Sequence, residues 1–144
     1  MNKRKQKDLE FGNTYERKVI EWLNKNTYKD NPLSFYKNPF NVMDMCNSTN
    51  ILELKTRRIF HNQYPDLMIG LNKIEEAENS DDNATYTMLF LCKDGLYGWD
   101  CVDGKSYEVR MGGRCDRGRD ERKICAFIPS EDLQLITTDI NSVS

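Results

Sequence analysis

Apolar residues at helical spacing define the first predicted element of the chain. They are Tyr15, Val19, Trp22 and Leu23. Recurrence every three or four positions predicts an α-helix over residues 15–26, with Asn13 or Thr14 as its N-cap. At about 100° per residue, Glu16 falls at the border of this apolar stripe and Glu21 on the opposite, solvated side. Glu16 is therefore expected to point toward whatever the helix covers.

Two β-prone segments flank a polar turn and predict a β-hairpin. The segments are residues 40–46 and 51–57, and the turn is Asn47–Asn50. The predicted pairs are Cys46 with Ile51, Met45 with Leu52, and Asp44 with Glu53. This register would place two carboxylates directly opposite each other.

Strand alternation gives the predicted hairpin two different faces. The face toward the core would carry Leu52, Leu54, Met43 and Met45. The opposite face would carry Ile51, Glu53, Lys55 and Arg57, with Asp44 beside them on the partner strand. Carboxylates that face each other destabilise a strand pair unless a cation compensates them. The pattern therefore indicates either a bound metal ion or an ordinary surface hairpin in which Lys55 neutralises both acids.

The scarcity of histidine limits which metal ions the predicted site could bind. His61 is the single histidine in the chain, and the five cysteines contain no CxxC pair. Sites built on several imidazoles, and zinc clusters, therefore lose support. The carboxylates of Asp44 and Glu53, with the Leu54 carbonyl between them and water, suit Mg²⁺ or Mn²⁺. Lys55 would then orient or deprotonate an attacking water, or stabilise the charge that develops on a phosphate.

The tripeptide Glu53-Leu-Lys55 is unspecific by itself, because the pattern acid-x-Lys occurs four times in the chain. The other three are Glu16-Arg-Lys18, Asp103-Gly-Lys105 and Glu121-Arg-Lys123. They are predicted to lie in a helix, a glycine turn and a charged loop. Glu53 alone is embedded in apolar strand residues with an acid opposite it, so its context singles it out.

Glu16 on an early helix, Asp44 on one strand and Glu53-Leu-Lys55 on the next resemble the PD-(D/E)xK nuclease superfamily. The nearest layout is that of small Holliday-junction resolvases, and the resemblance covers residues 12–57. The residue before Asp44 is a methionine instead of the proline of the motif, a variation that the superfamily tolerates.

The resemblance implies an α+β restriction-endonuclease-like core, with a mixed central sheet flanked by helices. It implies an endonuclease that hydrolyses DNA phosphodiesters with Mg²⁺ or Mn²⁺, leaving a 3′-hydroxyl and a 5′-phosphate. The implied catalytic residues are Asp44, Glu53, Lys55 and Glu16, and the implied metal ligands are Asp44, Glu53, Leu54 and Glu16. The small size favours a structure-selective or weakly sequence-specific enzyme and is compatible with a homodimer.

Basic residues beyond these are candidates for contact with DNA phosphates. They are Arg57 and Arg58 at the strand end, Lys73 on the following helix, and Arg114, Arg117 and Arg119 in a Gly/Arg-rich loop over residues 111–123. Lys73 also falls where related nucleases place an extra lysine or glutamine near the active site. For the strand end and the loop, solvated or self-paired charge is the alternative. His61 is expected to be exposed and incidental.

The rest of the chain continues as an α+β pattern. It predicts a helix over 67–78, a hairpin of 86–92 and 96–102, a strand over 106–110 that extends that sheet, and an apolar strand over 124–128. Pro65-Asp66 is assigned to a turn. The length of 144 residues allows one domain. It is predicted over 10–136, between a flexible basic arm at 1–9 and a flexible tail at 137–144.

Charge and cysteine content indicate which partners and which cellular compartment to expect. The net charge is −2, yet basic residues cluster near 55–58 and 110–123, so the total is weak evidence against DNA binding. An odd cysteine count and the lack of a long apolar run predict a soluble intracellular protein, cytoplasmic or nuclear, with no membrane partner. Abundant Asn and Lys would fit an AT-rich viral, phage or bacterial genome, and a viral protein would act in its host cell. The alternatives are a non-catalytic nucleic-acid-binding protein of this fold and a protein–protein interaction domain.

Overall fold

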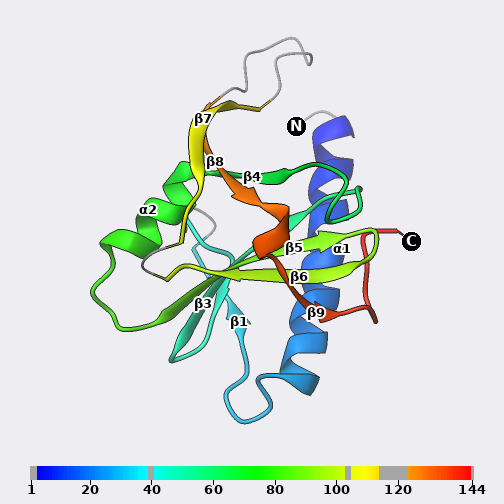
Figure 1. Cartoon of the computed structure of the whole chain (residues 1–144). Helices are drawn as coiled ribbons and strands as arrows, with labels where there is room; N and C mark the ends of the chain where they lie inside the picture. Colours follow the sequence, from blue (N-terminus) through cyan, green and yellow to red (C-terminus); the bar gives the residue numbers. More distant parts are fainter. Residues whose placement is uncertain (1–2, 39–40, 103–104, 114–122, 144) are drawn as a thin grey trace.

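The computed structural model describes residues 3–38, 41–102, 105–113 and 123–143, with side chains from Thr14 onward. In chain order the elements are α1 (Lys3–Asn26), β1 (Ser34–Phe35), β2 (Met45–Cys46), β3 (Asn50–Thr56), β4 (Asp66–Gly70), α2 (Leu71–Asn79), β5 (Thr85–Cys92), β6 (Gly95–Asp100), β7 (Glu108–Gly112), β8 (Lys123–Pro129), the 3₁₀ turn η1 (Ser130–Asp132) and β9 (Gln134–Thr137). Figure 1 shows their arrangement.

The described residues form two sheets. The larger has six strands in the order β1-β2-β3-β5-β6-β9, and the smaller has three in the order β4-β8-β7. β3 and β5 run parallel, whereas the other neighbours in both sheets are antiparallel. The predicted α+β class with a mixed central sheet is confirmed. The predicted hairpin around Lys93-Asp-Gly95 is also confirmed, as β5 and β6.

Helix α1 packs on one face of the larger sheet (Figure 1). Tyr15, Val19 and Leu23 are buried there against leucines of β3 and β5. The helix begins at Lys3, so the predicted N-cap position is wrong and the range predicted as a flexible arm overlaps its first turns. Residues 3–11 consist mostly of good helix formers, namely Lys, Arg, Gln, Leu and Glu, and one glycine at position 12 costs only about 1 kcal/mol. These residues therefore continue the helix toward the N-terminus.

A second core cluster lies between the other face of the larger sheet, α2 and the smaller sheet. Met88 and Phe90 of β5 contribute to it together with Ile74 of α2 and Ile128 of β8. β5 is apolar along almost its whole length because it is buried on both faces. Met43 belongs to this cluster and not to the one that holds Met45 and Leu52, so its predicted face is wrong.

The β2–β3 hairpin has the predicted register over two pairs. Met45 pairs with Leu52 and Cys46 with Ile51, around the predicted turn. The ladder ends there, because the backbone nitrogen of Asp44 donates to the carbonyl of Leu52 at 3.1 Å instead of continuing the register. The predicted strand pair of Asp44 and Glu53 is therefore wrong. The same irregularity breaks the alternation that was expected to place Met43 beside Met45.

Two further predictions fail because strand partners lie far away in the sequence. Residues 66–70 form β4, paired with β8, and the helix that was predicted from residue 67 begins only at Leu71. Asp66 accordingly lies in a strand and not in a turn. The strand predicted over 106–110 is β7, which pairs with β8 in the smaller sheet instead of extending the β5–β6 sheet.

The end of the described chain packs against the domain. Ser142 is buried; its backbone nitrogen donates to the Cys92 carbonyl at 2.9 Å, and its hydroxyl donates to the Arg57 carbonyl at 2.8 Å. The Tyr15 hydroxyl donates to the Ser142 carbonyl at 3.0 Å. These contacts join the end of the described chain to α1, to β5 and to the residue after β3. In the part of the chain that the structure describes, no helix has the length and apolar character needed to cross a bilayer.

Candidate active site

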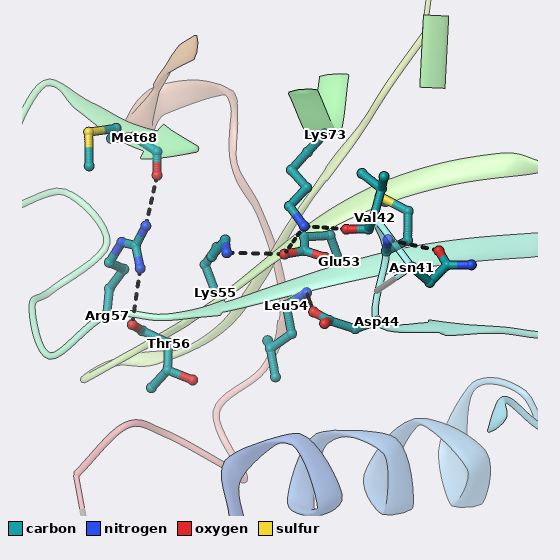
Figure 2. Close-up of polar contacts among 11 residues, drawn as sticks. Asn41, Val42, Asp44, Glu53, Leu54, Lys55, Thr56, Arg57, Met68 and Lys73 are labelled. Atoms are coloured by element: carbon teal, nitrogen blue, oxygen red, sulfur yellow. Dashed lines mark hydrogen bonds and ion pairs between the residues drawn. The ribbon is translucent and has the colours of Figure 1, made fainter. Parts of the chain in front are cut away.

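Glu53 is the buried centre of a cluster of charged side chains at the hairpin (Figure 2). It is carried by β3 and is only 2% exposed. Its Oε1 lies 3.1 Å from Lys55 Nζ, on the same strand, and 3.3 Å from Lys73 Nζ, on α2. Its Oε2 is buried and has no hydrogen-bond partner in the described structure. One carboxylate oxygen is therefore held by two ammonium groups while the other is left without a partner.

Burial dominates the electrostatics of Glu53. Its pKa is raised from 4.5 to about 7, chiefly by removal from water; the charge of Asp44 contributes to this rise, whereas Lys55 and Lys73 oppose it. A carboxylate in this position needs compensating positive charge to stay ionised. Lys55 and Lys73 supply part of this charge, and a further cation beside Glu53 would favour its ionised form.

Asp44 comes directly before β2 and reaches the edge of β3. Its Oδ2 accepts a hydrogen bond from the backbone nitrogen of Leu54 at 2.7 Å. In an extended strand the N–H and C=O of one residue point to the same side, so the Leu54 carbonyl faces this edge too. The carboxylate of Asp44 and the carbonyl of Leu54 are thus brought to one side of the strand that carries Glu53.

Lys73 lies in the first turn of α2, which follows β4 without a loop. Besides its ion pair with Glu53, its ammonium group donates a hydrogen bond to the carbonyl of Val42 (Figure 2). Lys73 was predicted as a DNA contact close to the active site. In the structure its ammonium group lies within the carboxylate cluster itself. It joins α2 to β3 and to the segment that precedes Asp44.

Glu16 lies on the face of α1 that approaches this cluster, and its side chain is half-buried. Burial raises its pKa, Asp44 raises it further, and Lys55 lowers it. Glu16 is therefore within electrostatic range of both residues. Glu21 is exposed, so the two glutamates lie on the sides of the helix that were predicted for them.

The donor set fits a hard divalent cation. Within the described ranges, no three His, Cys, Asp or Glu side chains lie close enough together to hold a metal by themselves. Mg²⁺ does not need three, because it keeps several waters and binds one or two carboxylates together with substrate phosphate. The unpartnered oxygen of Glu53, the carboxylate of Asp44 and the Leu54 carbonyl provide such a set.

The other predicted DNA contacts fall into three groups. Arg57 is half-buried and donates to the carbonyls of Met68 at 2.9 Å and Thr56 at 3.3 Å. Burial lowers its pKa. Arg58 is exposed at the end of β3. Arg114, Arg117 and Arg119 lie outside the described residues.

His61 makes two side-chain contacts that the sequence did not predict. Its Nδ1 lies 2.5 Å from Asp94 Oδ2, and its ring stacks on Tyr97 with centroids 4.2 Å apart. Its side chain is partly buried, which differs from the predicted exposed position. The contact ties the segment after β3 to the β5–β6 hairpin. It was missed because Asp94 is distant in the sequence and belongs to a turn motif.

Comparison with known protein families agrees with the resemblance that was based on the acids and the lysine of the hairpin. A family model described as "Phage putative PDDEXK endonuclease" matches residues 5–134. The chain belongs to this family. The match runs from α1 into β9, so the PD-(D/E)xK assignment extends well beyond residues 12–57, on which the resemblance was based. It does not address the Holliday-junction-resolvase layout. No curated protein matches the chain.

The family match covers the hairpin on which two acids and a lysine gather. In this fold β2 and β3 bring Asp44 to the strand that carries Glu53 and Lys55, while α1 brings Glu16 to the same region. The restriction-endonuclease-like α+β core that the sequence implied is confirmed. Its nuclease lineage, with the phage origin that the family name carries, is the strongest guide to function.

Proposed function

We propose that this protein is a Mg²⁺-dependent DNA endonuclease that hydrolyses phosphodiester bonds at the Asp44–Glu53–Lys55 site. The observation that carries the proposal is Glu53: a buried carboxylate with one oxygen held by lysines and the other unpartnered. Such an arrangement is costly for folding alone and is typical of a site that binds a cation. The family match supports the reaction class.

Asp44 and Glu53 would hold the metal, the Leu54 carbonyl would complete the protein ligands, and Glu16 would assist through water. Mn²⁺ can replace Mg²⁺ because both prefer oxygen ligands. When bound, the metal supplies positive charge that polarises the scissile phosphate and favours deprotonation of water. The Leu54 N–H fixes one oxygen of Asp44 and leaves the other free for binding.

Lys55 orients the attacking water. Its ammonium group is held by Glu53 at 3.1 Å, and its side chain is 29% exposed, so it is both positioned and accessible to substrate. Lys55 can hold a water by hydrogen bonding and can stabilise negative charge as it develops on the phosphate. In-line attack at phosphorus leaves a 3′-hydroxyl and a 5′-phosphate. Lys73 acts as a positioning residue, because it contacts Glu53 and Val42.

DNA is the proposed partner, and residues 10–136 are the proposed nuclease domain. Arg58 and the basic segment around residues 110–123 would follow the phosphate backbone. Arg57 would contact a phosphate close to the scissile bond, since it lies two residues beyond Lys55. The small domain favours a substrate recognised by shape or by weak sequence preference.

The test is cleavage of supercoiled, linear, single-stranded and four-way-junction DNA, each with Mg²⁺, Mn²⁺ or EDTA. We expect metal-dependent cleavage that Lys55→Ala reduces by a factor of roughly 10² to 10⁴. Lys25→Ala is the matched control, because Lys25 is an exposed lysine in the last turn of α1. Absence of metal-dependent cleavage of every substrate, or full activity of Lys55→Ala, would contradict the proposal.

One observation favours a second candidate, a DNA-binding protein that keeps the fold without cutting. Two lysines already neutralise one oxygen of Glu53, an arrangement that can be purely structural. Binding of these DNAs without cleavage under any metal condition would support this candidate.

A further inference from the structure

A pocket of about 500 Å³ lies beside the end of β3. The residues that matter in its lining are Arg57, Tyr64, Asp66, Met68, Arg110 and Phe127. The backbone nitrogen of Arg57 donates to Leu91 at 2.8 Å, so the extended pairing with β5 continues to this residue. Strand alternation then puts its side chain on the same face as Glu53 and Lys55. The pocket therefore adjoins the proposed site of cleavage.

Arg110 forms a flat, oriented surface in this pocket. Its guanidinium carbon lies 3.7 Å from the centroid of the Phe127 ring. Its Nη2 lies 2.7 Å from Asp66 Oδ2 and its Nε lies 3.0 Å from Glu108 Oε2. Two carboxylates thus hold the edge of the guanidinium and neutralise its charge, while Phe127 covers one face. Its side chain is still 50% exposed, which leaves the other face open for stacking.

Arg57 provides the complementary charge. Its guanidinium hydrogen bonds go to backbone carbonyls, and no carboxylate in the described part of the chain forms an ion pair with it. A half-buried cation without a counter-charge is energetically unfavourable and attracts an anion. Tyr64 adds an aromatic ring that is 54% exposed. The pocket thus offers a flat π surface and an aromatic ring beside an uncompensated positive charge.

We propose that this pocket binds an unpaired nucleotide next to the scissile phosphate. Its base stacks on Arg110 and Tyr64, and its phosphate pairs with Arg57. Bases of single-stranded nucleic acid stack on aromatic rings and on guanidinium planes, whereas a base paired within a duplex keeps its faces covered by its neighbours. This inference rests on the proposed nuclease function and specifies the substrate class: DNA with an unpaired nucleotide at a flap, bulge, junction or single strand. An acidic peptide fits less well, because carboxylates already occupy the edge of Arg110.

The test compares two fluorescein-labelled duplexes, each with one bulged position, by fluorescence anisotropy in EDTA so that no strand is cut. One carries a normal unpaired nucleotide and the other an abasic residue at the same place. We expect the wild type to bind the first about tenfold more tightly. Tyr64→Ala and Arg110→Ala should bring the ratio of the two affinities close to one. Phe35→Ala, at an exposed aromatic residue on β1, should leave the ratio unchanged.

Arg57→Gln should weaken binding of both duplexes equally and reduce the salt dependence by about one phosphate contact, without changing the ratio. Equal wild-type affinities, or a wild-type ratio in both Tyr64→Ala and Arg110→Ala, would overturn the stacking proposal. An Arg57→Gln variant with unchanged affinity and salt dependence would overturn the phosphate contact. Circular dichroism checks that each variant folds. If Arg110→Ala does not fold, the binding ratio of Tyr64→Ala, at an exposed residue, decides the test.

Cleavage of the same duplexes by the wild type with Mg²⁺ separates this inference from the proposed function. If the enzyme cleaves with Mg²⁺ but binds the two duplexes equally well, the nucleotide-binding proposal is refuted and the nuclease proposal stands. If the protein binds the unpaired nucleotide more tightly than the abasic residue but cleaves neither duplex, the nuclease proposal is refuted and the pocket stands as a nucleotide-binding site.

Discussion

Lys73 Nζ lies 3.3 Å from Glu53 Oε1 and also donates to the carbonyl of Val42, two residues before Asp44. A single side chain of α2 therefore joins the two segments that carry the proposed metal ligands. Its charge also lowers the pKa of Glu53, against the effect of burial. Lys73 is thus placed to set both the spacing and the ionisation of the carboxylates.

Replacement of Lys73 by methionine should make cleavage more dependent on pH. Without this ammonium group the pKa of Glu53 rises above about 7, so less of the carboxylate is ionised at neutral pH. We expect a roughly threefold to tenfold loss of cleavage at pH 7 and a smaller loss at pH 9. Lys73→Arg, which keeps the charge, should stay closer to the wild type. A loss that is equal at both pH values would contradict the electrostatic role.

Asp44 offers a way to separate metal binding from folding. In Asp44→Asn the amide oxygen can still accept the hydrogen bond from Leu54, whereas in Asp44→Ala it is lost. Both variants should lose metal-dependent cleavage. Urea denaturation in EDTA should show a loss of about 1–2 kcal/mol in the free energy of unfolding for Asp44→Ala and a much smaller loss for Asp44→Asn. Cleavage by Asp44→Asn at the wild-type rate would rule out Asp44 as a ligand.

Glu16 and Glu21 form a matched pair on one helix. Glu16 approaches Asp44 and Lys55, whereas Glu21 is exposed on the other side of α1. Glu16→Gln should raise the Mg²⁺ concentration for half-maximal cleavage by about tenfold, which is typical when a group that supports a metal site is removed. Glu21→Gln should have no effect. Equal Mg²⁺ requirements for the two variants would remove Glu16 from the site.

The metal-free protein should become less stable as the pH rises. Burial raises the pKa of Glu53 from 4.5 to about 7, so the folded state binds a proton more tightly than the unfolded chain does. This contribution is complete below about pH 4.5 and is lost as the pH rises through about 7. Its size is on the order of 3 kcal/mol. Denaturation in EDTA between pH 5 and pH 8 should show this fall in the wild type and in Glu21→Gln, but not in Glu53→Gln.

The parts of the fold that depend on local pattern could be predicted from the sequence. The apolar stripe of α1 fixed the positions of Glu16 and Glu21, and the polar turn fixed the pairing of Met45 with Leu52. The nuclease lineage followed from four side chains on these elements. Local spacing was enough in each case because a helix face or a hairpin register involves residues that are close in the sequence.

The parts that depend on distant partners could not be predicted. Residues 66–70 have apolar positions that suit a helix, and they become a strand because β8, about 60 residues later, pairs with them. This boundary also decides where α2 begins, and hence that Lys73 reaches Glu53. The irregular backbone at Asp44 has no sequence signature. It places the carboxylate on the Leu54 N–H instead of directly across from Glu53.

The hydrogen bond between Leu54 and Asp44 has a spectroscopic consequence. The acceptor for this amide is a side-chain carboxylate, so its proton chemical shift depends on the charge carried by that carboxylate. In a ¹⁵N-labelled protein, the Leu54 resonance should move on titration with Mg²⁺, whereas amides in the middle of β5 should remain in place. One backbone signal would thus serve as an internal indicator of whether Mg²⁺ occupies the proposed site.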